Sequence, residues 1–133
     1  MAVTFDFEGD VALVTGASGA LGSAVAAAFA DAGATVAAAD IVDIDDEDSL
    51  LEPREEINFY RADFTDEEAV ADTVEAVVSD HGQIDYLLNI AGTWRGGDPV
   101  HETDESTFDL LFDVNLKTMF LASKHALPHL QDS

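Results

Sequence analysis

A glycine-rich turn between two apolar segments constrains this chain more than any other feature of its sequence. Residues 11–14 form a short apolar run with two β-branched side chains, which predicts a buried strand. Thr15-Gly16 interrupts that run, and the alanine-rich stretch from Leu21 to Ala32 predicts a helix. A strand, a glycine turn and a helix in this order form the first half of a βαβ unit of the kind that binds nucleotides.

The three glycines of this turn have separate expected roles. Gly16 permits the tight turn, Gly19 lets the backbone come close to a diphosphate, and Gly22 lets the helix pack closely on the strand. The diphosphate is expected at the N-terminus of the helix, where free N–H groups and the helix dipole attract anions. The alternative is a glycine-rich turn that binds no ligand.

The rest of the chain continues the alternation of strands and helices. The expected strands are residues 8–15, 34–40, 57–62 and 84–88, and the expected helices are residues 21–32, 66–81 and 104–130. We expect Thr65 and Thr103 to cap the later two helices, and the acidic residues 41–56 to form a loop or a short exposed helix. This order predicts one domain over residues 1–133, an α/β fold with a three-layer, doubly wound parallel sheet in the strand order 3-2-1-4.

The charge of the chain limits its partners and its setting. It holds 28 Asp and Glu against 5 Lys and Arg, a formal net charge of −23, yet 47% of its residues are hydrophobic, too many for an acidic disordered tail. Molar salt screens such self-repulsion, so we favour a protein of a high-salt cytoplasm over an acidic surface made for a basic partner. Nucleic-acid binding is disfavoured because no basic patch exists.

Other features of the sequence exclude some kinds of site and limit the expected location of the protein. The chain has no cysteine, which excludes a disulfide and a thiolate metal site. The N-terminal residues 1–8 have no basic region and no long apolar run, and no segment is apolar enough to span a bilayer. We therefore expect a cytoplasmic location and no membrane partner.

An acidic residue at the end of the second strand suggests the choice of cofactor. Asp40 lies 18 residues after Gly22, where a carboxylate meets the ribose hydroxyls of a bound dinucleotide. It would repel a 2′-phosphate, and the sequence puts no Arg or Lys nearby to neutralise one, so NAD is favoured over NADP. The alternative is that Asp40 is one more acid in an acidic protein.

Several motifs together resemble the short-chain dehydrogenase/reductase family. Thr15, Gly16 and Gly22 match its Thr-Gly-x-x-x-Gly-x-Gly motif, with Ala20 in place of the middle glycine. Further along the chain, Asp63-Phe64, Asn89-Ile-Ala-Gly92 and Asn115 resemble the next motifs of the family, in the right order. The resemblance implies a Rossmann-like fold and these cofactor-binding residues: Gly16, Ser18, Gly19, Ala20, Leu21, Gly22, Asp40, Ile41, Asp63, Phe64, Asn89, Ala91 and Gly92.

The resemblance also assigns roles to the later motifs. Asp63 and Phe64 are expected beside the adenine ring, and Asn89 is expected to brace the central sheet. Ala91-Gly92 would let the cofactor pass close to the backbone. Asn115 matches the helix asparagine that helps to hold a proton-relay water, which makes it the single candidate catalytic residue; the alternative is an ordinary polar residue on a helix.

The main catalytic group of the family does not occur in these 133 residues. The family uses a Ser and a Tyr-x-x-x-Lys pair, whereas neither Tyr60 nor Tyr86 has a Lys four residues later. We therefore interpret the chain as the cofactor-binding half of an NAD-dependent oxidoreductase acting on a carbonyl or secondary alcohol, cut before its fifth strand. The alternative is a non-catalytic NAD-binding or assembly module complete at this length.

Partner and minor-site expectations follow. The strand that leads to Asn89 would become an open edge, so we expect a homo-oligomer through that edge or through the helix face of residues 108–121. His125 and His129 could bind a metal, but cations near a helix C-terminus are the simpler account, and we expect no metal. Weaker candidates are the pair Asp109 and Asp113 as acid and base, against a solvated face, and Trp94 at a substrate mouth, against a loop anchor.

Overall fold

The computed structural model describes residues 2–133, which alternate between strands and helices as expected. The strands are β1 (Val11–Thr15), β2 (Thr35–Asp40), β3 (Ile57–Arg61) and β4 (Tyr86–Leu88). The helices are α1 (Ala20–Asp31), α2 (Glu67–His81), α3 (Glu105–Phe112) and α4 (Thr118–Gln131), with a 3₁₀ turn η1 (Val100–Glu102) and a π turn η2 (Asp113–Lys117). The strands are shorter than expected by one to three residues, and residues 41–56 form a loop with turns and no helix.

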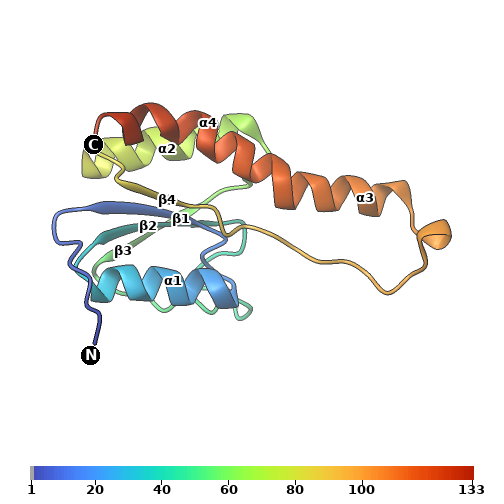
Figure 1. The fold of residues 1–133 in the computed structure, drawn as a ribbon, viewed down its shortest axis with the longest axis horizontal. Coiled ribbons are helices and arrows are strands. Elements are labelled where there is room, and N and C mark those ends of the chain that lie inside the picture. Colours follow the sequence, from blue (N-terminus) through green and yellow to red (C-terminus); the bar gives the residue numbers. More distant parts are fainter. Residues whose placement is uncertain (1) are drawn as a thin grey trace.

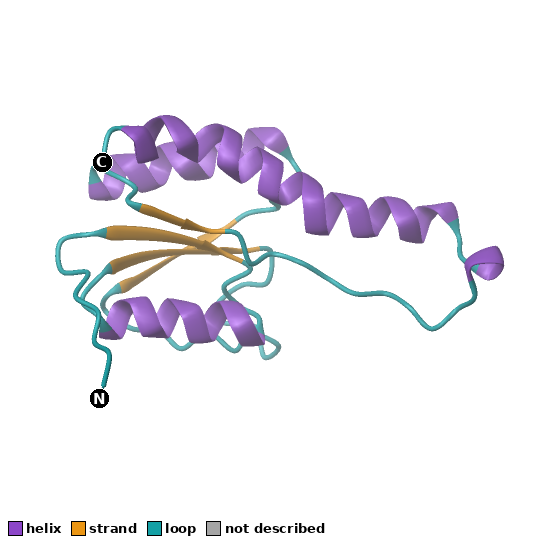
Figure 2. Cartoon of the chain, in the orientation of Figure 1, coloured by secondary structure: helices purple, strands orange, loops and turns teal. Residues whose placement is uncertain are grey.

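The four strands form one parallel sheet in the order β3-β2-β1-β4, which confirms the predicted 3-2-1-4 topology. Leu13 of β1 pairs with Ala37 of β2 on one side and with Leu87 of β4 on the other. Helix α1 covers one face of the sheet, and α2 and α4 lie side by side on the other face (Figure 1; Figure 2). The result is the three-layer arrangement that a doubly wound sheet requires.

Small side chains bring the layers together. One core cluster joins β1 and β2 to α2 and α4 through residues such as Leu13, Val70 and Ala122. The other joins the opposite face of the same strands to α1, where Ala26 and Ala30 are buried. Alanine at these helix positions costs little conformational entropy and lets α1 approach the sheet closely.

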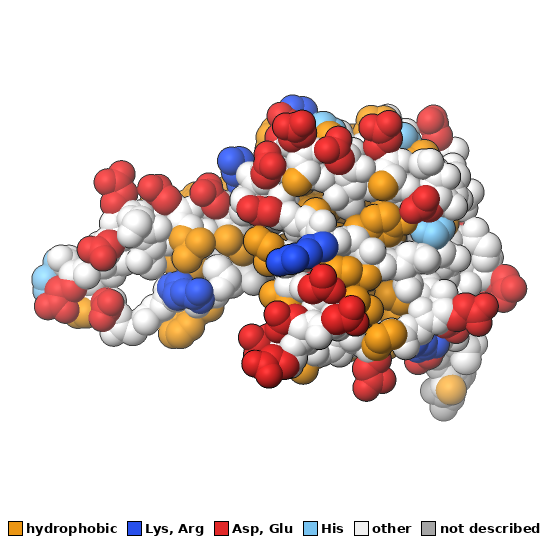
Figure 3. Space-filling view, turned by 180° about the vertical axis from the view of Figure 1, so that it is seen from behind, with side chains coloured by type: hydrophobic (Ala, Val, Ile, Leu, Met, Phe, Trp, Pro, Cys, Tyr) orange, Lys and Arg blue, Asp and Glu red, His pale blue; other side chains and the backbone are white. Residues whose placement is uncertain are grey.

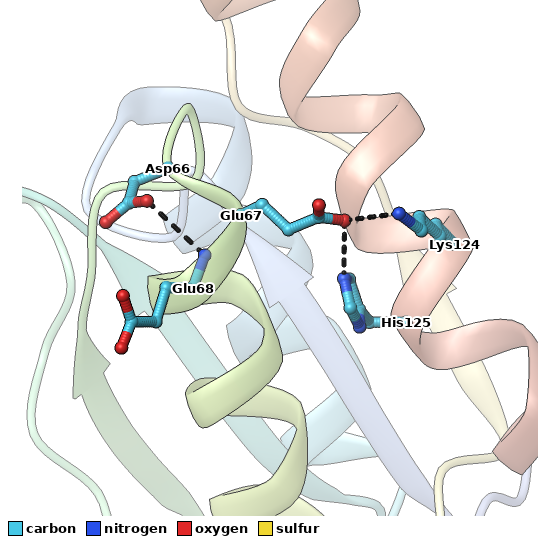
Figure 4. Close-up of polar contacts among 5 residues, drawn as sticks. All are labelled: Asp66, Glu67, Glu68, Lys124 and His125. Atoms are coloured by element: carbon cyan, nitrogen blue, oxygen red, sulfur yellow. Dashed lines mark hydrogen bonds and ion pairs between the residues drawn. The ribbon is translucent and has the colours of Figure 1, made fainter.

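The start of α2 differs from the expectation. Asp66 is the N-cap, and its carboxylate accepts a hydrogen bond from the Glu68 N–H at 3.3 Å (Figure 4). Thr65 is not the cap, because its hydroxyl donates to Asp63 at 2.7 Å instead. The helix ends at His81 and is capped by Gly82, whose φ of 83° is left-handed.

The long C-terminal helix is interrupted. Residues 113–117 form a π turn between α3 and α4, and Thr103 ends the preceding 3₁₀ turn instead of capping α3. Asp104 precedes α3 without a capping hydrogen bond from its side chain. Residues 93–117, which we name the arm, extend away from the body of the molecule (Figure 1). No helix within residues 2–133 combines the length and apolarity needed to cross a membrane.

Candidate functional site

A cavity of about 640 Å³ opens at the carboxyl ends of β1, β2 and β3. Parallel α/β sheets bind ligands at this edge, outside the ends of the strands. Its lining residues come from the ends of β1 and β2, from the glycine turn, from the segments that follow β2, β3 and β4, from the arm and from the start of α4: Thr15, Gly16, Ser18, Gly19, Ala39, Asp40, Ile41, Val42, Asp48, Ala62, Asp63, Phe64, Thr65, Ala91, Gly92, Thr93, Arg95, Leu110, Asp113, Val114 and Thr118.

The glycine turn is shaped by close backbone contacts. Gly16 has a φ of 65°, and an added Cβ there would lie 2.7 Å from the Cα and N atoms of Ala91. A Cβ on Gly22 would overlap the carbonyl oxygen of Gly16, so Gly22 packs on the turn itself and not only on the strand. Gly19 differs, since a Cβ there would meet nothing nearer than 3.6 Å. The surroundings of Gly19 therefore leave room for a ligand to approach the backbone.

The N-termini of α1 and α2 differ in their caps and in the charge of their first turns. Helix α2 has an aspartate cap and carries Glu67 and Glu68 in its first turn. Helix α1 begins after Gly19 with no side-chain cap and no acid in its first turn, although 28 of the 133 residues are acidic. An acid in the first turn usually stabilises a helix, and its absence at α1 leaves the backbone N–H groups and the positive end of the dipole for an external anion.

Asp40 connects two walls of the cavity. Its Oδ2 atom accepts a hydrogen bond from the Ser18 N–H of the glycine turn, and its Oδ1 atom accepts one from the Val42 N–H, each at 2.9 Å. The Ser18 hydroxyl, in turn, donates to the Val42 carbonyl at 2.8 Å. Asp40 is therefore a structural link as well as the acid at the end of β2.

A basic residue, Arg61, lies near Asp40 at this end of the cavity. In the register of β2 and β3, Asp40 pairs with Arg61, and the Arg61 Nε–H donates to the Ile41 carbonyl at 3.1 Å. The expectation that no Arg or Lys lies near Asp40 is therefore wrong. The sequence concealed this contact, because the two residues are 21 positions apart and meet only through the pairing of the strands.

Thr15 holds the segment that follows β4. Its hydroxyl accepts hydrogen bonds from the Ile90 and Ala91 N–H groups, both at 3.1 Å. Asn89 was expected to brace the sheet, but its amide donates to the Ser123 hydroxyl of α4 at 3.3 Å, so it links the sheet to that helix. Thr15 is thus a site residue that sequence reasoning named in the motif but did not assign to the cavity.

The end of β3 supplies the opposite wall. Asp63 accepts hydrogen bonds from the N–H and the hydroxyl of Thr65, at 2.9 and 2.7 Å, which fixes its carboxylate at the turn into α2. Phe64 is buried in the core cluster beneath α2 and α4 and lines the cavity as well. One acid and one apolar surface therefore lie where an adenine ring was expected.

Asn115 lies within the π turn and fastens the base of the arm. Its Oδ1 accepts a hydrogen bond from the Thr93 N–H and its Nδ2 donates to the Thr93 carbonyl, both at 2.9 Å. A Cβ on Gly92 would come within 2.8 Å of the same Oδ1 atom. The side chain of Asn115 is thus engaged with the segment after β4, and π turns are frequent at functional sites.

The two tyrosines do not replace the missing acid. The Tyr60 hydroxyl donates to Asp80 at 2.6 Å, and partial burial together with Asp80 raises the pKa of Tyr60. The Tyr86 hydroxyl donates to Asp10 at 3.1 Å, and that hydrogen bond, with desolvation, raises the pKa of Tyr86. Neither residue lines the cavity, and a raised pKa makes a phenol less ready to give up its proton.

The weaker candidates have other environments. His125 Nε2 lies 2.9 Å from Glu67, which also pairs with Lys124 at 2.6 Å (Figure 4), and no group of three potential metal ligands occurs among residues 2–133. Trp94 is 77% exposed on the arm and is not one of the residues that line the cavity. Asp109 and Asp113 are both exposed, and only Asp113 lines the cavity.

The cavity brings together nine of the fourteen site residues expected from the sequence: Gly16, Ser18, Gly19, Asp40, Ile41, Asp63, Phe64, Ala91 and Gly92. Outside its lining are Ala20, Leu21 and Gly22 at the start of α1, Asn89 beside α4, and Asn115 in the π turn. The arm residues Thr93, Leu110 and Val114 were missed, because no local pattern shows that the arm turns back to the cavity through the π turn.

Comparison with known proteins agrees with this geometry. Residues 10–133 match the family described as short chain dehydrogenase. The chain is 36% identical over 127 residues to 3-oxoacyl-(acyl-carrier-protein) reductase of Thermotoga maritima, covering 92% of this chain and 51% of that protein. It is 35% identical over 126 residues to (+)-borneol dehydrogenase 1 of Salvia officinalis, covering 94% of this chain and 48% of that one.

Solved structures show the same relationship. The 3-ketoacyl-(acyl-carrier-protein) reductase of Brucella melitensis complexed with NADH matches with a TM-score of 0.86 and 29% identity, over 96% of this chain and 52% of that one. The chain spans about half the length of the curated relatives and solved structures that it matches. By its sequence motifs, its sheet topology and these matches, the chain belongs to the short-chain dehydrogenase/reductase family.

Proposed function

We propose that the cavity binds NAD(H), and that the chain forms the cofactor-binding half of an oxidoreductase acting on a carbonyl or a secondary alcohol. The observation that carries the proposal is the N-terminus of α1, which has no side-chain cap and no acid in its first turn. It lies beside Gly19, whose surroundings leave space for a ligand. The Asp40 carboxylate follows at the end of the neighbouring strand β2. An anion-attracting helix end beside a ribose-accepting carboxylate matches the two polar parts of a dinucleotide.

The residues of the chain divide the binding between them. The first N–H groups of α1 would hold the diphosphate, and the free lone pairs of Asp40 would accept the ribose hydroxyls. Asp63 and Phe64 would flank the adenine, and Ala91-Gly92 would pass beside the nicotinamide half. A bound nicotinamide supplies a hydride donor or acceptor, while this chain binds and orients it.

Calorimetry with NADH and NADPH tests the assignment of Asp40. NADH is expected to bind at least about tenfold more tightly, roughly 1.4 kcal/mol, because a carboxylate accepts hydroxyls and repels a phosphate. Asp40→Ala should narrow that difference. A thermal melt of the variant is needed as a control, since Asp40 also accepts two backbone hydrogen bonds. Equal affinities in the parent chain would overturn the role of Asp40.

A non-catalytic NAD-binding or assembly module is the second candidate; the position of the two tyrosines outside the cavity lining favours it. Both candidates predict binding without turnover for these 133 residues, because general acid–base catalysis contributes about 10²–10⁴-fold. The downstream reading frame separates them: a Ser and a Tyr-x-x-x-Lys would support the half-enzyme, and an immediate stop codon would support the module.

We also infer that a second copy covers the exposed apolar face of α3, the π turn and α4. Large apolar side chains are exposed along it: Phe108, Leu110, Phe112, Leu116, Met119, Phe120 and Leu127. Residues 114–131 contain no acid and hold the only two lysines, so charge opposes contact less there than at α3, which carries Glu105 and Asp109, or on the acid-rich surface that Figure 3 shows. Sedimentation should show association, which Phe108→Ser with Phe112→Ser should abolish; a monomer at all concentrations would contradict it.

A further inference from the structure

Arg61 is next to the Asp40 end of the cavity but is not one of its lining residues. It is the last residue of β3 and the register partner of Asp40, and it precedes Ala62 and Asp63, which line the cavity. Its Nε–H donates to the carbonyl of Ile41, another lining residue, at 3.1 Å. This contact holds an exposed guanidinium beside the first residue after Asp40.

The charge of Arg61 is not used in an ion pair within residues 2–133. The ion pairs of this part of the chain join Arg54 to Asp31 and Glu56, and join Lys124 and His125 to Glu67. Only the Nε–H of Arg61 donates to a backbone carbonyl, so the other guanidinium N–H groups remain to bind an anion. Because a guanidinium matches phosphate geometry with two parallel N–H donors, a phosphate is the anion that it fits best.

The Asp40 carboxylate repels an anion less strongly than an isolated aspartate would. Both Asp40 oxygens already accept backbone N–H groups, from Ser18 and Val42. Those donors direct positive partial charge at the carboxylate, and Arg61 on the adjacent strand contacts the carbonyl of the next residue, Ile41. This end of the cavity is thus an acid and a base on adjacent strands, not a lone acid.

We propose that Arg61 is a specificity-determining residue that binds the 2′-phosphate of NADP(H) and so keeps that cofactor as a weaker second ligand of a site that prefers NAD(H). The inference rests on the proposed function, since it assumes that the adenosine half lies between Asp40 and Asp63. Asp40 causes the preference for NAD(H), and Arg61 reduces the difference in affinity between NAD(H) and NADP(H).

Calorimetry at one fixed salt concentration tests the proposal with four probes: NADH, NADPH, 5′-AMP and adenosine 2′,5′-bisphosphate. Arg61→Gln should weaken NADPH and the bisphosphate by about fivefold, the scale of an exposed charge pair, and should change NADH and 5′-AMP by less than about twofold. Arg61→Lys should retain part of the affinity for the 2′-phosphate. Arg54→Gln is the matched control, because the Arg54 guanidinium is already paired with Asp31 and Glu56, whereas no ion pair of residues 2–133 involves Arg61.

Each other outcome overturns the proposal. If Arg61→Gln weakens NADH and NADPH equally, Arg61 only positions the Ile41 segment; if it changes neither, the guanidinium does not reach the ligand. If NADH binds to the parent chain, both of these results leave the proposed function intact. If none of the four probes binds to the parent chain, the proposed function fails and this inference fails with it.

Discussion

The βαβ unit of residues 11–40 and the arm of residues 93–117 differ in how far their side chains are buried. In the first, all five residues of β1 are buried, and the glycine turn is held to β2 and its following loop by Asp40 and Ser18. In the second, neither α3 nor the π turn has a buried residue, and several large apolar side chains are exposed. Charge does not separate the two regions, because acids occur in both.

Packing is therefore what separates them. Both faces of β1 and β2 are buried, one against α1 and the other against α2 and α4, so the two core clusters hold the βαβ unit in place. The arm lacks a core of its own and is fastened at its base by the pair of hydrogen bonds between Asn115 and Thr93. The edge of the cavity formed by the glycine turn and Asp40 is supported by buried residues, whereas the arm depends on the Asn115–Thr93 hydrogen bonds.

Gly22→Ala should have the largest effect, because it strikes the packed unit. The new methyl group would overlap the carbonyl oxygen of Gly16, and the backbone of a tight turn cannot move aside. We expect a loss of about 3 kcal/mol of stability, roughly 10 °C in the melting midpoint, together with weaker NADH binding. Gly97→Ala on the arm, where an added Cβ meets nothing within 4 Å, is the control for glycine replacement outside the packed unit, although its φ of 105° adds some strain.

Salt should act on the body and the arm together. The net charge of −23 opposes compaction, and the Debye length falls from about 10 Å at 0.1 M to about 3 Å at 1 M salt. Thermal melts from low to molar KCl should therefore show a rising midpoint. A flat series would argue against the high-salt interpretation and in favour of an acidic surface made for a basic partner.

Protein concentration separates screening from association in that series. Midpoints raised by screening do not depend on the concentration of the chain, whereas midpoints raised by pairing of the apolar faces do.

Asn115→Ala should loosen the arm and leave the βαβ unit unchanged. The variant loses two exposed hydrogen bonds to Thr93, worth about 1 kcal/mol each, so local opening should increase by roughly tenfold or more. Trypsin measures this directly, because Arg95 lies in the arm. Cleavage after Arg95 should accelerate, while cleavage after Arg54, which belongs to the loop before β3, should not. Equal acceleration at both sites would mean that the two regions unfold as one.

The same contrast explains what the sequence could predict. The fold was predictable because β1, α1 and β2 have strong local patterns and because the positive φ of Gly16 and the contact of Gly22 with Gly16 are local needs. Asp40 was placed by its spacing from the turn. Its link to Ser18 and its neighbour Arg61 were not predictable, since they arise from strand pairing across more than twenty residues.

The arm escaped prediction for a different reason. Residues 104–130 have a helical pattern throughout, and nothing in that pattern distinguishes a continuous α-helix from one with a π turn at residues 113–117. The caps were misplaced by one residue because Thr and Asp are both good N-caps and stand side by side at positions 65–66 and 103–104.

The smallest expected effect concerns Glu67, which joins α4, the helix that continues the arm, to α2. Hydrogen bonds from Lys124 and then His125 lower the pKa of Glu67 below its usual value of 4.5 (Figure 4). A carboxylate with a lowered pKa stabilises the fold above its unfolded pKa, and that contribution is lost as the pH falls through the folded value. Glu67→Gln should therefore melt below its control at pH 7 and converge with it under pH 4, by a smaller margin than Asn115→Ala produces because the pair is exposed.

Glu68→Gln is the matched control for Glu67→Gln. It removes the same charge one position along α2, where Figure 4 shows the Glu68 carboxylate pointing away from α4. Removing any acid relieves self-repulsion in a chain of net charge −23, so a comparison with the parent alone would mix that gain with the loss of the ion pair. The difference between the two variants isolates the contact to α4. If that difference is absent at pH 7, or persists unchanged below pH 4, Glu67 does not anchor the arm to the body through its ionised form.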